Sequence, residues 1–429
     1  MAKKVYKIGF LGMGTIAQGV YKHLTKKKSA LEKEFDAKYE LVKVCDLDFT
    51  KALELGIPRE KLTKNALDVV DDPEIDIVCE LIGGVNAAFD FTMRALKNGK
   101  VVVSANKAVI CEKGKQIFEA SNFESYFFEA SVGGSIPIIK VVREALVANK
   151  FEHIYGILNG TCNYILTRMA NEGSPFEEIL ADAKKLGYAE ANDTLDVDGF
   201  DTAHKAVILT YLATGKWIKQ SQMIIEGIRQ VKQQDIKWAK ENGYSIKLVA
   251  SVNTRFRGKK VFTSVRPALV ARDSVLGNVN GVYNAVAVEG DLIGTGIYIG
   301  KGAGQDPTSS AVISDIFDAI KYLKGGPKIG DLCEHDDIKI ADLEEVKGVY
   351  YVRICVKDKP GVLAGIAEKF ARHGISIELM EQSKHDEPSK AWLIMITHQT
   401  NEKAIKGLFA DLKKTTVVQD NPFVLRIFE

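Results

Sequence analysis

The sequence of 429 residues lacks a long apolar run and an excess of charge of either sign. No segment is apolar over the roughly 20 residues that a transmembrane helix needs. The first residues, MAKKVYKIGF, pass directly into an expected strand instead of forming a signal peptide. A formal net charge of +2 gives no reason to expect a nucleic acid or a membrane as partner. We therefore expect a cytoplasmic protein.

Paired cysteines are absent as well. The chain has six cysteines, without a Cys-x-x-Cys pair or a cluster with histidine. This scattering argues against a zinc site and against a disulfide framework. Reduced and mostly buried thiols are the expectation.

Near the N-terminus, residues 5–20 (VYKIGFLGMGTIAQGV) have the pattern of a strand, a glycine turn and a helix start. Gly12 and Gly14, with alanine at the third position, match G-x-G-x-x-G/A, in which a dinucleotide pyrophosphate approaches the helix N-terminus. A second strand, residues 39–45, ends at Asp46, the usual place for an acid that binds the adenosine ribose. Its distance from Gly14 exceeds the usual spacing of about 20 residues, which predicts an enlarged first crossover. A glycine turn without a ligand is the alternative.

Two further buried-type runs indicate a parallel sheet. Residues 75–81 close in Ile82-Gly83-Gly84, and residues 100–103 lead into Ser104-Ala105-Asn106-Lys107. Ligands bind at the carboxyl edge of such sheets, so Lys107 is placed to reach the nicotinamide or the substrate. An isolated lysine after a strand would more often be solvent-exposed.

The middle of the chain predicts an α/β domain with an open sheet. A glycine-rich turn at 131–137 opens a helix through Arg143. The other expected elements are strands at 153–158, 247–253, 260–269, 282–289 and 294–299 and helices at 161–171, 175–186 and 200–214. A sheet with one helical face often leaves the other face for dimerisation. After a second glycine-rich segment, an apolar helix at 308–321 is expected to return the chain to the cofactor domain.

Acidic residues and an amine gather between residues 187 and 205, as would suit a charged amino-acid substrate. They are Glu190, Asp196, Asp201 and Lys205. Asp201 and Lys205 are four residues apart in a helical pattern and should share one face of a helix start. Such a pair can hold an ammonium or hydroxyl group while the lysine donates a proton. An exposed ion pair, worth only about 0.3–0.5 kcal/mol, is the alternative.

In their order, these elements resemble homoserine dehydrogenase over residues 7–323. The glycine turn, Ser-Ala-Asn-Lys, Glu-Ala-Ser-Val-Gly-Gly, Asn-Gly-Thr and Gly-x-Asp-x-x-x-Lys all appear. The resemblance implies NAD(P)-dependent interconversion of L-aspartate 4-semialdehyde and L-homoserine in threonine, methionine and isoleucine biosynthesis. The alternative is a non-catalytic, dinucleotide-dependent amino-acid sensor, which would not need the proton donor.

The resemblance also implies roles for individual residues. Lys205 would donate a proton to the aldehyde oxygen, and Lys107 would assist in binding or proton transfer. The substrate would be held by Glu190, Asp196, Asp201, Gly160 and Thr161. The cofactor would be held by Gly12, Gly14, Thr15, Ile16, Asp46, Gly83, Lys107 and Gly304. A structural sodium ion would be held by the side chain of Glu129 and by backbone carbonyls of Val132, Gly134 and Ile136.

The sequence departs from the family pattern at two places, and each departure predicts a property of the protein. Asn192-Asp193 stands where the family usually has a proline, which predicts a less rigid loop after Glu190. Cys45 stands where many relatives carry a basic residue, so a 2′-phosphate loses an obvious partner and NAD is favoured over NADP.

Cys162 raises the hypothesis of a semialdehyde dehydrogenase, in which a cysteine nucleophile works with a histidine base. His204 could be cast as that base, but no motif supports the pairing. His204 adjoins Lys205 on the expected helix and points about 100° away from it, which favours a surface or packed histidine.

The C-terminal region predicts a β-α-β-β-α-β unit, with strands at 350–356, 375–381, 391–398 and 417–427 and helices at 362–372 and 402–413. The Asp-x-Pro-Gly turn before the first helix resembles the ACT domain. The resemblance implies pairing through domain edges and a threonine effector that inhibits by feedback. Its contacts would be backbone groups around Asp358, Gly361, Val362 and Leu363. A dimerisation module that binds nothing is the alternative.

The expected fold class is therefore α/β, with a Rossmann-type domain, an inserted α/β domain with an open sheet, and a ferredoxin-like ACT domain. The domains are predicted at 1–129 with 303–323 for the dinucleotide, 130–302 for substrate and dimerisation, 324–346 as a linker, and 347–429 for regulation. A homodimer or homotetramer is expected.

Overall fold

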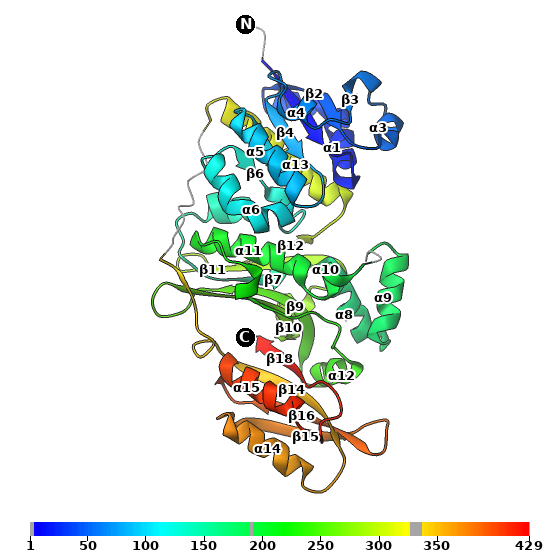
Figure 1. The fold of residues 1–429 in the computed structure, drawn as a ribbon, viewed down its shortest axis with the longest axis vertical. Coiled ribbons are helices and arrows are strands. Elements are labelled where there is room, and N and C mark those ends of the chain that lie inside the picture. Colours follow the sequence, from blue (N-terminus) through cyan, green and yellow to red (C-terminus); the bar gives the residue numbers. More distant parts are fainter. Residues whose placement is uncertain (1–3, 189–191, 327–336, 429) are drawn as a thin grey trace. The chain divides into compact units, whose positions relative to one another are not determined.

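The structure is a computed structural model that describes residues 4–188, 192–326 and 337–428 (Figure 1). Chain packing separates two compact units. The first unit comprises residues 1–154, 204–221 and 283–336, and the second comprises residues 155–203, 222–282 and 337–429. Among the described helices, none is both long enough and apolar enough to cross a membrane. The five described cysteines form no disulfide bond.

Six parallel strands form a sheet in the first unit. They are β1 (Val5–Leu11), β2 (Lys38–Cys45), β3 (Leu62–Thr63), β4 (Ile77–Glu80), β5 (Val101–Ser104) and β6 (Tyr126–Phe127). Their order is β3-β2-β1-β4-β5-β6, which is the order of dinucleotide-binding folds, with its switch point between β1 and β4. All residues of β4 and β5 are buried, as expected for parallel strands covered on both faces. The predicted Rossmann-type sheet is confirmed.

The first unit also contains helices around this sheet. They are α1 (Thr15–Lys26), α2 (Lys28–Glu34), α3 (Thr50–Glu54), η1 (Arg59–Lys61), α4 (Leu67–Val70), α5 (Asn86–Lys97), α6 (Lys107–Ala120) and α13 (Gln305–Leu323). The first crossover contains two helices, α1 and α2, which explains the long interval before Asp46. Helix α13 packs on α1 so closely that a Cβ on Gly19 would lie 2.3 Å from Ser309 Oγ. The chain therefore returns to the cofactor sheet, as predicted.

A different helix type follows the glycine-rich turn of the first unit. After η2 (Glu129–Ser131), helix α7 covers only Ile138–Lys140 and gives way to a π-helical turn, η3 (Val141–Ala145). The Leu146 N–H donates to the Val141 carbonyl at 2.9 Å, five residues back. The predicted helix through Arg143 is thus confirmed, and its second half is π-helical. The wider turn accompanies burial of Arg143, whose guanidinium lies 5.5 Å from the Phe128 ring centroid.

The first unit also contains an antiparallel hairpin, β11 (Tyr283–Gly290) and β12 (Gly294–Lys301), which precedes α13. Three elements have residues in both units: β7 (Phe151–Ile157), α11 (Phe200–Thr214) and the short turn η4 (Gln220–Gln222). The expected strands and helix at these places are confirmed to within a few residues.

The second unit is built on a mixed sheet with the order β9-β10-β18-β14-β16-β15. Its strands are β8 (Ile224–Ile225), β9 (Tyr244–Asn253), β10 (Lys260–Ala271), β13 (Lys339–Ile340), β14 (Lys347–Lys357), β15 (Ile377–Lys384), β16 (Lys390–Thr397), β17 (Thr400–Asn401) and β18 (Phe423–Phe428). Its helices are α8 (Gly160–Glu172), α9 (Phe176–Lys185), α10 (Thr194–Val197), α12 (Gln233–Glu241), α14 (Val362–Arg372) and α15 (Glu402–Lys413), with a short turn at η5 (Leu276–Asn278).

The β-α-β-β-α-β order of the ACT module is confirmed, and both of its helices begin and end where predicted. Its last strand is shorter than predicted, because β18 begins at Phe423 and not at Val417. Residues 415–418 form a turn instead, closed by the Val418 N–H on the Thr415 carbonyl at 3.0 Å. Pro422, which has no N–H, stands directly before the strand. Strand β18 pairs with β14 on one side and, in parallel, with β10 on the other.

Candidate active site

The glycine turn after β1 leaves the start of helix α1 open. Gly12 has φ +94°, and a Cβ there would lie 2.8 Å from the Leu81 carbonyl oxygen, so only glycine fits. Gly14 is the N-cap of α1, and a Cβ on it would meet nothing within 4 Å. Thr15 and Ile16 are the first helical residues. The first turn of a helix has N–H groups without intrahelical partners, as a phosphate site requires.

Asp46 holds this turn to the end of β2. Its Oδ2 accepts the Met13 N–H at 2.5 Å, and its Oδ1 accepts the Asp48 N–H at 3.0 Å. Each carboxylate oxygen keeps a further lone pair. The carboxylate is thus fixed at the carboxyl edge, where it can still accept a hydroxyl.

Glu80, at the end of β4, is a buried acid to which the sequence reasoning gave no role. It accepts the Ser104 hydroxyl at 2.6 Å and the Ile82 N–H at 3.2 Å. Burial raises the pKa of Glu80 to about 7, against the lowering effect of these hydrogen bonds. The available signal was a carboxylate that closes the apolar run IDIVC.

Asn106 joins the ends of β4 and β5. Its side chain accepts the Val109 N–H at 3.1 Å as the N-cap of α6, and its amide donates to the Gly84 carbonyl at 2.7 Å. Lys107, the first residue of α6, is partly buried beside this anchor. Gly83 lies in the anchored loop, and a Cβ on it would meet nothing within 4 Å.

The N-terminus of α13 lies against the start of α1. Gly304 is its N-cap with φ +117°. The Gln305 amide donates to the Thr15 carbonyl at 2.9 Å, and the Ser309 hydroxyl donates to the Ile16 carbonyl at 3.1 Å. The predicted cofactor residues therefore gather around the carboxyl ends of β1, β4 and β5.

In the second unit, Asn159 binds two of the predicted acids at once. Its amide donates to Asp196 Oδ1 at 2.7 Å and to Asp201 Oδ2 at 3.0 Å, while its carbonyl oxygen accepts the Cys162 N–H at 2.8 Å as the N-cap of α8. Asn159 itself is buried. The sequence reasoning assigned it no role, although an asparagine before a helix start is a capping signal.

The neighbours of Asn159 at the start of α8 are equally constrained. A Cβ on Gly160 would lie 2.7 Å from the Val282 carbonyl oxygen. The Thr161 hydroxyl donates to the Tyr188 carbonyl at 2.6 Å. The Cys162 thiol is buried and donates to the Asp196 carbonyl at 3.2 Å.

Asp201 and Lys205 lie in successive turns of α11, as predicted from their spacing. They are only 8% and 6% exposed, so the alternative of an exposed ion pair is wrong. His204 is partly buried on the same helix. Glu190 lies outside the residues that the structure describes.

Asp193, which replaces the family's proline, is anchored through its side chain. Lys184 Nζ lies 2.6 Å from one carboxylate oxygen, and Arg229 binds the other. Burial raises the pKa of Asp193, but the two cations outweigh it and hold the pKa below its ordinary value. Two ion pairs thus fix the chain at this position.

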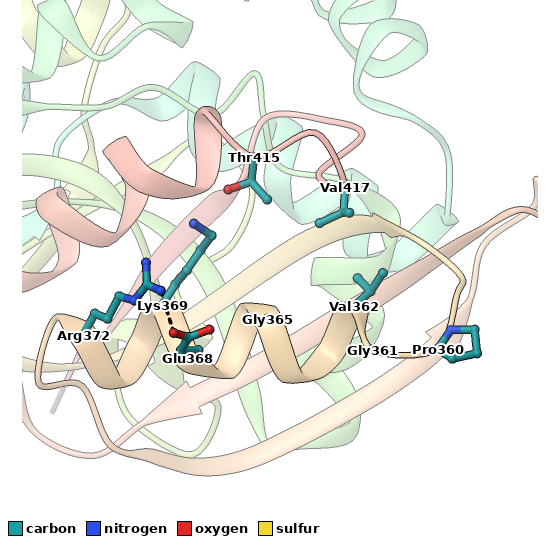
Figure 2. Close-up of a pocket in the computed structure, with 9 residues that line it drawn as sticks. All are labelled: Pro360, Gly361, Val362, Gly365, Glu368, Lys369, Arg372, Thr415 and Val417. Carbon is teal, nitrogen blue, oxygen red and sulfur yellow. Dashed lines mark hydrogen bonds and ion pairs between the residues drawn. The ribbon is translucent and has the colours of Figure 1, made fainter.

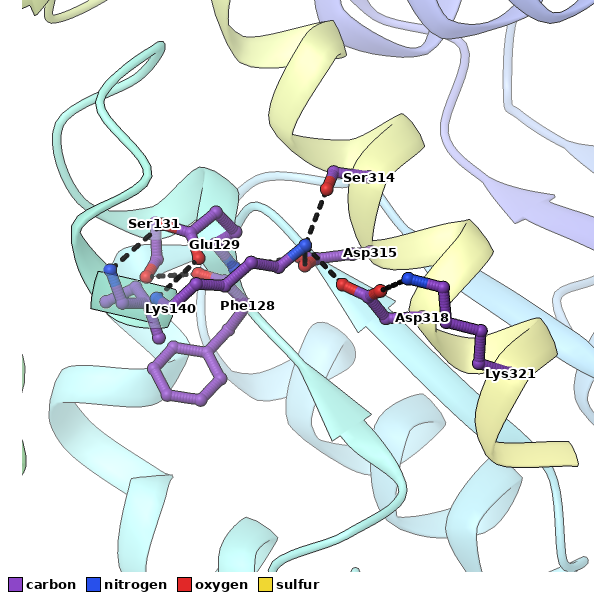
Figure 3. Close-up of polar contacts among 9 residues, drawn as sticks. Phe128, Glu129, Ser131, Lys140, Ser314, Asp315, Asp318 and Lys321 are labelled. Carbon is purple, nitrogen blue, oxygen red and sulfur yellow. Dashed lines mark hydrogen bonds and ion pairs between the residues drawn. The ribbon is translucent and has the colours of Figure 1, made fainter. Parts of the chain in front are cut away.

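The predicted sodium ligands lie within residues 129–136 of the first unit, and Figure 3 shows one of them, Glu129. Both oxygens of Glu129 accept backbone N–H groups, those of Ile139 and Lys140, each at 2.9 Å. Burial raises the pKa of Glu129 to about 7. Gly133 and Gly134 both have positive φ, which turns the backbone between Val132 and Ile136 sharply. Among the described residues, no group of three or more His, Cys, Asp or Glu side chains could hold a metal ion.

The same turn is tied to α13 (Figure 3). Asp315 Oδ2 accepts the Glu129 N–H at 2.8 Å, and Lys140 Nζ binds the hydroxyl of Ser314 and the carboxylate of Asp318. Burial, with Glu129 nearby, raises the pKa of Asp315 well above its ordinary value. These contacts hold the segment from Glu129 to Lys140, which follows β6, against α13.

Comparison with known proteins agrees with this geometry. A profile of the homoserine dehydrogenase family matches residues 137–317, that of the homoserine dehydrogenase NAD-binding domain matches residues 12–126, and that of the ACT domain matches residues 350–416. Homoserine dehydrogenase of Neisseria gonorrhoeae is 36% identical over 99% of both chains. The chain belongs to the homoserine dehydrogenase family.

Further homoserine dehydrogenases extend the likeness. That of Synechocystis is 38% identical and covers 98% of this chain and 99% of its own. The crystal structure of homoserine dehydrogenase from Thiobacillus denitrificans superposes with a TM-score of 0.91 at 37% identity, over 100% of this chain and 99% of its own. A hyperthermophilic archaeal homoserine dehydrogenase in complex with NADPH matches 76% of this chain with a TM-score of 0.64 at 26% identity. This homoserine dehydrogenase family member is an NAD(P)-dependent oxidoreductase.

Proposed function

We propose that the chain interconverts L-aspartate 4-semialdehyde and L-homoserine, with the residues predicted above as its working groups. The observation that carries the assignment is the shared amide of Asn159, which holds the carboxylates of Asp196 and Asp201 at one helix start. Two ordered carboxylates suit the ammonium group of an amino-acid substrate. The sensor alternative is not favoured, because full-length relatives are named as dehydrogenases.

Lys205 acts as the proton donor in this proposal. The nicotinamide, when bound, supplies a hydride to the aldehyde carbon or accepts it from the alcohol carbon. Lys205 gives a proton to the aldehyde oxygen in reduction and stabilises the charge that develops there. Asp196 and Asp201, with Glu190, hold the amino and hydroxyl ends, and Gly160 and Thr161 shape the site. Lys107 assists in binding or in proton transfer.

For the cofactor, we propose NAD in preference to NADP. The residues around Asp46 fit a dinucleotide, because the turn at Gly12 and Gly14 leaves the α1 N-terminus open. Asp46 still has lone pairs for a ribose hydroxyl, whereas a 2′-phosphate would meet its negative charge. A ratio of kcat/KM for NADH over NADPH below one would contradict this preference.

We also propose the structural sodium ion. The donor set suits a hard cation, because Glu129 supplies a buried carboxylate and the turn at Gly133 and Gly134 bends the backbone that carries the other proposed ligands. The ion would offset the charge of Glu129 and order this turn. Its loss should lower the melting temperature in sodium-free buffer relative to sodium buffer of equal ionic strength.

The ACT module has a cavity that fits a small effector (Figure 2). Its volume is about 570 Å³, and it lies between α14 and the turn after α15, lined by Pro360, Gly361, Val362, Gly365, Glu368, Lys369, Arg372, Thr415 and Val417. The predicted contacts Gly361 and Val362 are among them. We propose threonine as the effector and feedback inhibition as the result, in a cytoplasmic homodimer or homotetramer. Absence of both calorimetric heat and rate change on threonine addition would contradict this assignment.

The proposed reaction is tested by oxidation of NADH and NADPH with L-aspartate 4-semialdehyde. Lys205→Ala should lose turnover by about 1,000-fold or more while cofactor binding, measured by fluorescence, persists. Lys97→Ala, an exposed lysine of α5, serves as the matched control and should turn over normally. A folded wild-type chain without turnover would reject the dehydrogenase and favour the sensor.

A further inference from the structure

Residues 226–232 form a segment, here called the connector, that runs from β8 to α12 in the second unit. It begins where β8 pairs in parallel with β10 and ends at Lys232, the N-cap of α12. No motif in the sequence singled it out. Its residues contact two places: helix α10, which carries Asp196, and the ACT module.

On one side, Arg229 binds both ends of α10. Its Nε donates to Asp198 Oδ1 at 2.7 Å, and its Nη2 binds the carboxylate of Asp193. Asp193 is the N-cap residue of α10 and Asp198 is its C-cap residue. A helix of four residues is too short to be stable by itself, so its position depends on contacts of this kind.

The backbone of the connector is equally close to α10. The Ile228 N–H donates to the Val197 carbonyl at 2.8 Å, which satisfies an acceptor that the end of a helix leaves open. A Cβ on Gly227 would lie 2.2 Å from the same oxygen, so no side chain fits there. Asp196, whose carboxylate accepts the Asn159 amide, stands next to this anchor.

On the other side, the connector is held by the ACT module. Lys232 forms an ion pair with Asp420, and its ammonium lies 5.1 Å from the ring centroid of Trp392. The Gln230 carbonyl accepts from Arg353 Nη2 at 3.0 Å. Connector residues at 227–229 thus face α10, while those at 230 and 232 face the ACT module.

Arg353 makes this attachment rigid. Its side chain is fully buried, and its Nε donates to Asp235 Oδ1 at 2.8 Å, which also accepts the Tyr351 hydroxyl at 2.8 Å. Removing one partner of a buried ion pair leaves an uncompensated charge, so Arg353 and Asp235 hold each other in place. Strand β14, which carries Arg353, ends at Lys357 just before the cavity residue Pro360. A displacement of β14 at the cavity would therefore reach the connector through the buried side chain of Arg353.

We propose that Arg229 is a positioning residue for α10 and that the connector couples the ACT module to the substrate carboxylates. The inference rests on the proposed function, since it is there that Asp196 is assigned to the substrate. Displacement of β14 or of the turn at Asp420 moves Gln230 and Lys232, and Arg229 transfers that movement to α10. The coupling therefore acts on substrate affinity and not on the nicotinamide cofactor.

The test compares the full-length chain with Arg229→Gln and Lys232→Ala, with Lys237→Ala as the matched control. Lys237 is an exposed lysine of α12 that faces Glu241. Arg229→Gln should raise the KM for L-aspartate 4-semialdehyde about 10-fold, and Lys232→Ala about threefold, while kcat and the KM for the cofactor change less than twofold. Hydrogen exchange of peptides covering 193–201 should rise in both variants and not in Lys237→Ala. Arg229→Lys, which keeps the charge but not the forked geometry, should restore part of the affinity.

The possible outcomes distinguish the positioning role of Arg229, the coupling to the ACT module and the proposed function. Unchanged KM and exchange in Arg229→Gln would overturn the positioning role. A change in Arg229→Gln with Lys232→Ala identical to the control would overturn the coupling to the ACT module. If the wild-type chain has no turnover, the proposed function fails, and the exchange measurement still decides whether the connector restrains α10.

Discussion

The carboxyl edge of the parallel sheet is built from backbone groups, whereas the cluster around Asn159 is built from side-chain charge. At the sheet edge, glycine turns and helix starts present N–H groups, and side chains such as Asp46 mainly hold loops in place. Around Asn159, one side-chain amide donates to the carboxylates of both Asp196 and Asp201. Adding a side chain at a glycine disrupts a site built from backbone groups. Replacing a single polar or charged side chain disrupts a cluster of carboxylates.

The largest effect is expected from Asn159→Asp, which replaces the donor between Asp196 and Asp201 with a third carboxylate. An uncompensated buried charge costs about 3–5 kcal/mol, so kcat/KM should fall about 1,000-fold if the third carboxylate disrupts the site to that extent. Steady-state kinetics on the folded variant measures this change. Asn171→Asp, on the exposed surface of α8, should behave as wild type, and equal behaviour of the two variants would refute the cluster.

Next in size is the contrast between Gly12→Ala and Gly14→Ala. A methyl group at Gly12 would clash with the Leu81 carbonyl at positive φ, so both folding stability, by about 1–3 kcal/mol, and cofactor affinity should fall. A methyl group at Gly14 meets open space at φ −67°, so only cofactor affinity should fall. Thermal unfolding and cofactor titration separate the two. Equal stability loss in both variants would contradict the open helix start.

A smaller effect concerns pH. Burial raises the pKa of Glu80 from its ordinary 4.5 to about 7, so the folded chain retains a proton that the unfolded chain releases. The stability that this group contributes is complete below pH 4.5 and is lost as the pH rises through 7. From pH 5 to pH 8, the unfolding free energy of wild type should therefore fall by up to about 3 kcal/mol relative to Glu80→Gln. Parallel curves for the two proteins would show that Glu80 is not protonated in the folded state.

The smallest effect is expected from Cys162→Ala. The buried thiol donates to the Asp196 carbonyl and makes a weak hydrogen bond, so turnover should change by no more than about threefold. Cys111→Ala is the control. Loss of turnover by orders of magnitude in Cys162→Ala alone would restore the hypothesis of a cysteine nucleophile.

More of the carboxyl edge of the parallel sheet than of the cluster around Asn159 could be predicted from the sequence. Gly12, Gly14 and Asp46 could be placed because each restricts the backbone or ends a strand, which is local information. The contact of Asn159 with Asp196 and Asp201 joins residues 37 and 42 positions apart, and no local pattern encodes it. Burial of Glu80 likewise depends on how β5 lies beside β4. The strand predicted at 417–427 is confirmed only from Phe423 onward, and before it Val418 makes a single antiparallel bridge with Val356.

The parallel pairing of β10 with β18 has a consequence for how the chain is made. Strand β10 leaves the ribosome long before residues 423–428 are synthesised, so during that interval one of its edges has no partner from β18. Strands of other chains can pair with an unpaired edge, so this edge of the nascent chain needs protection until β18 has been synthesised. Chaperone dependence of folding yield should therefore be greatest in chains stalled between these two strands.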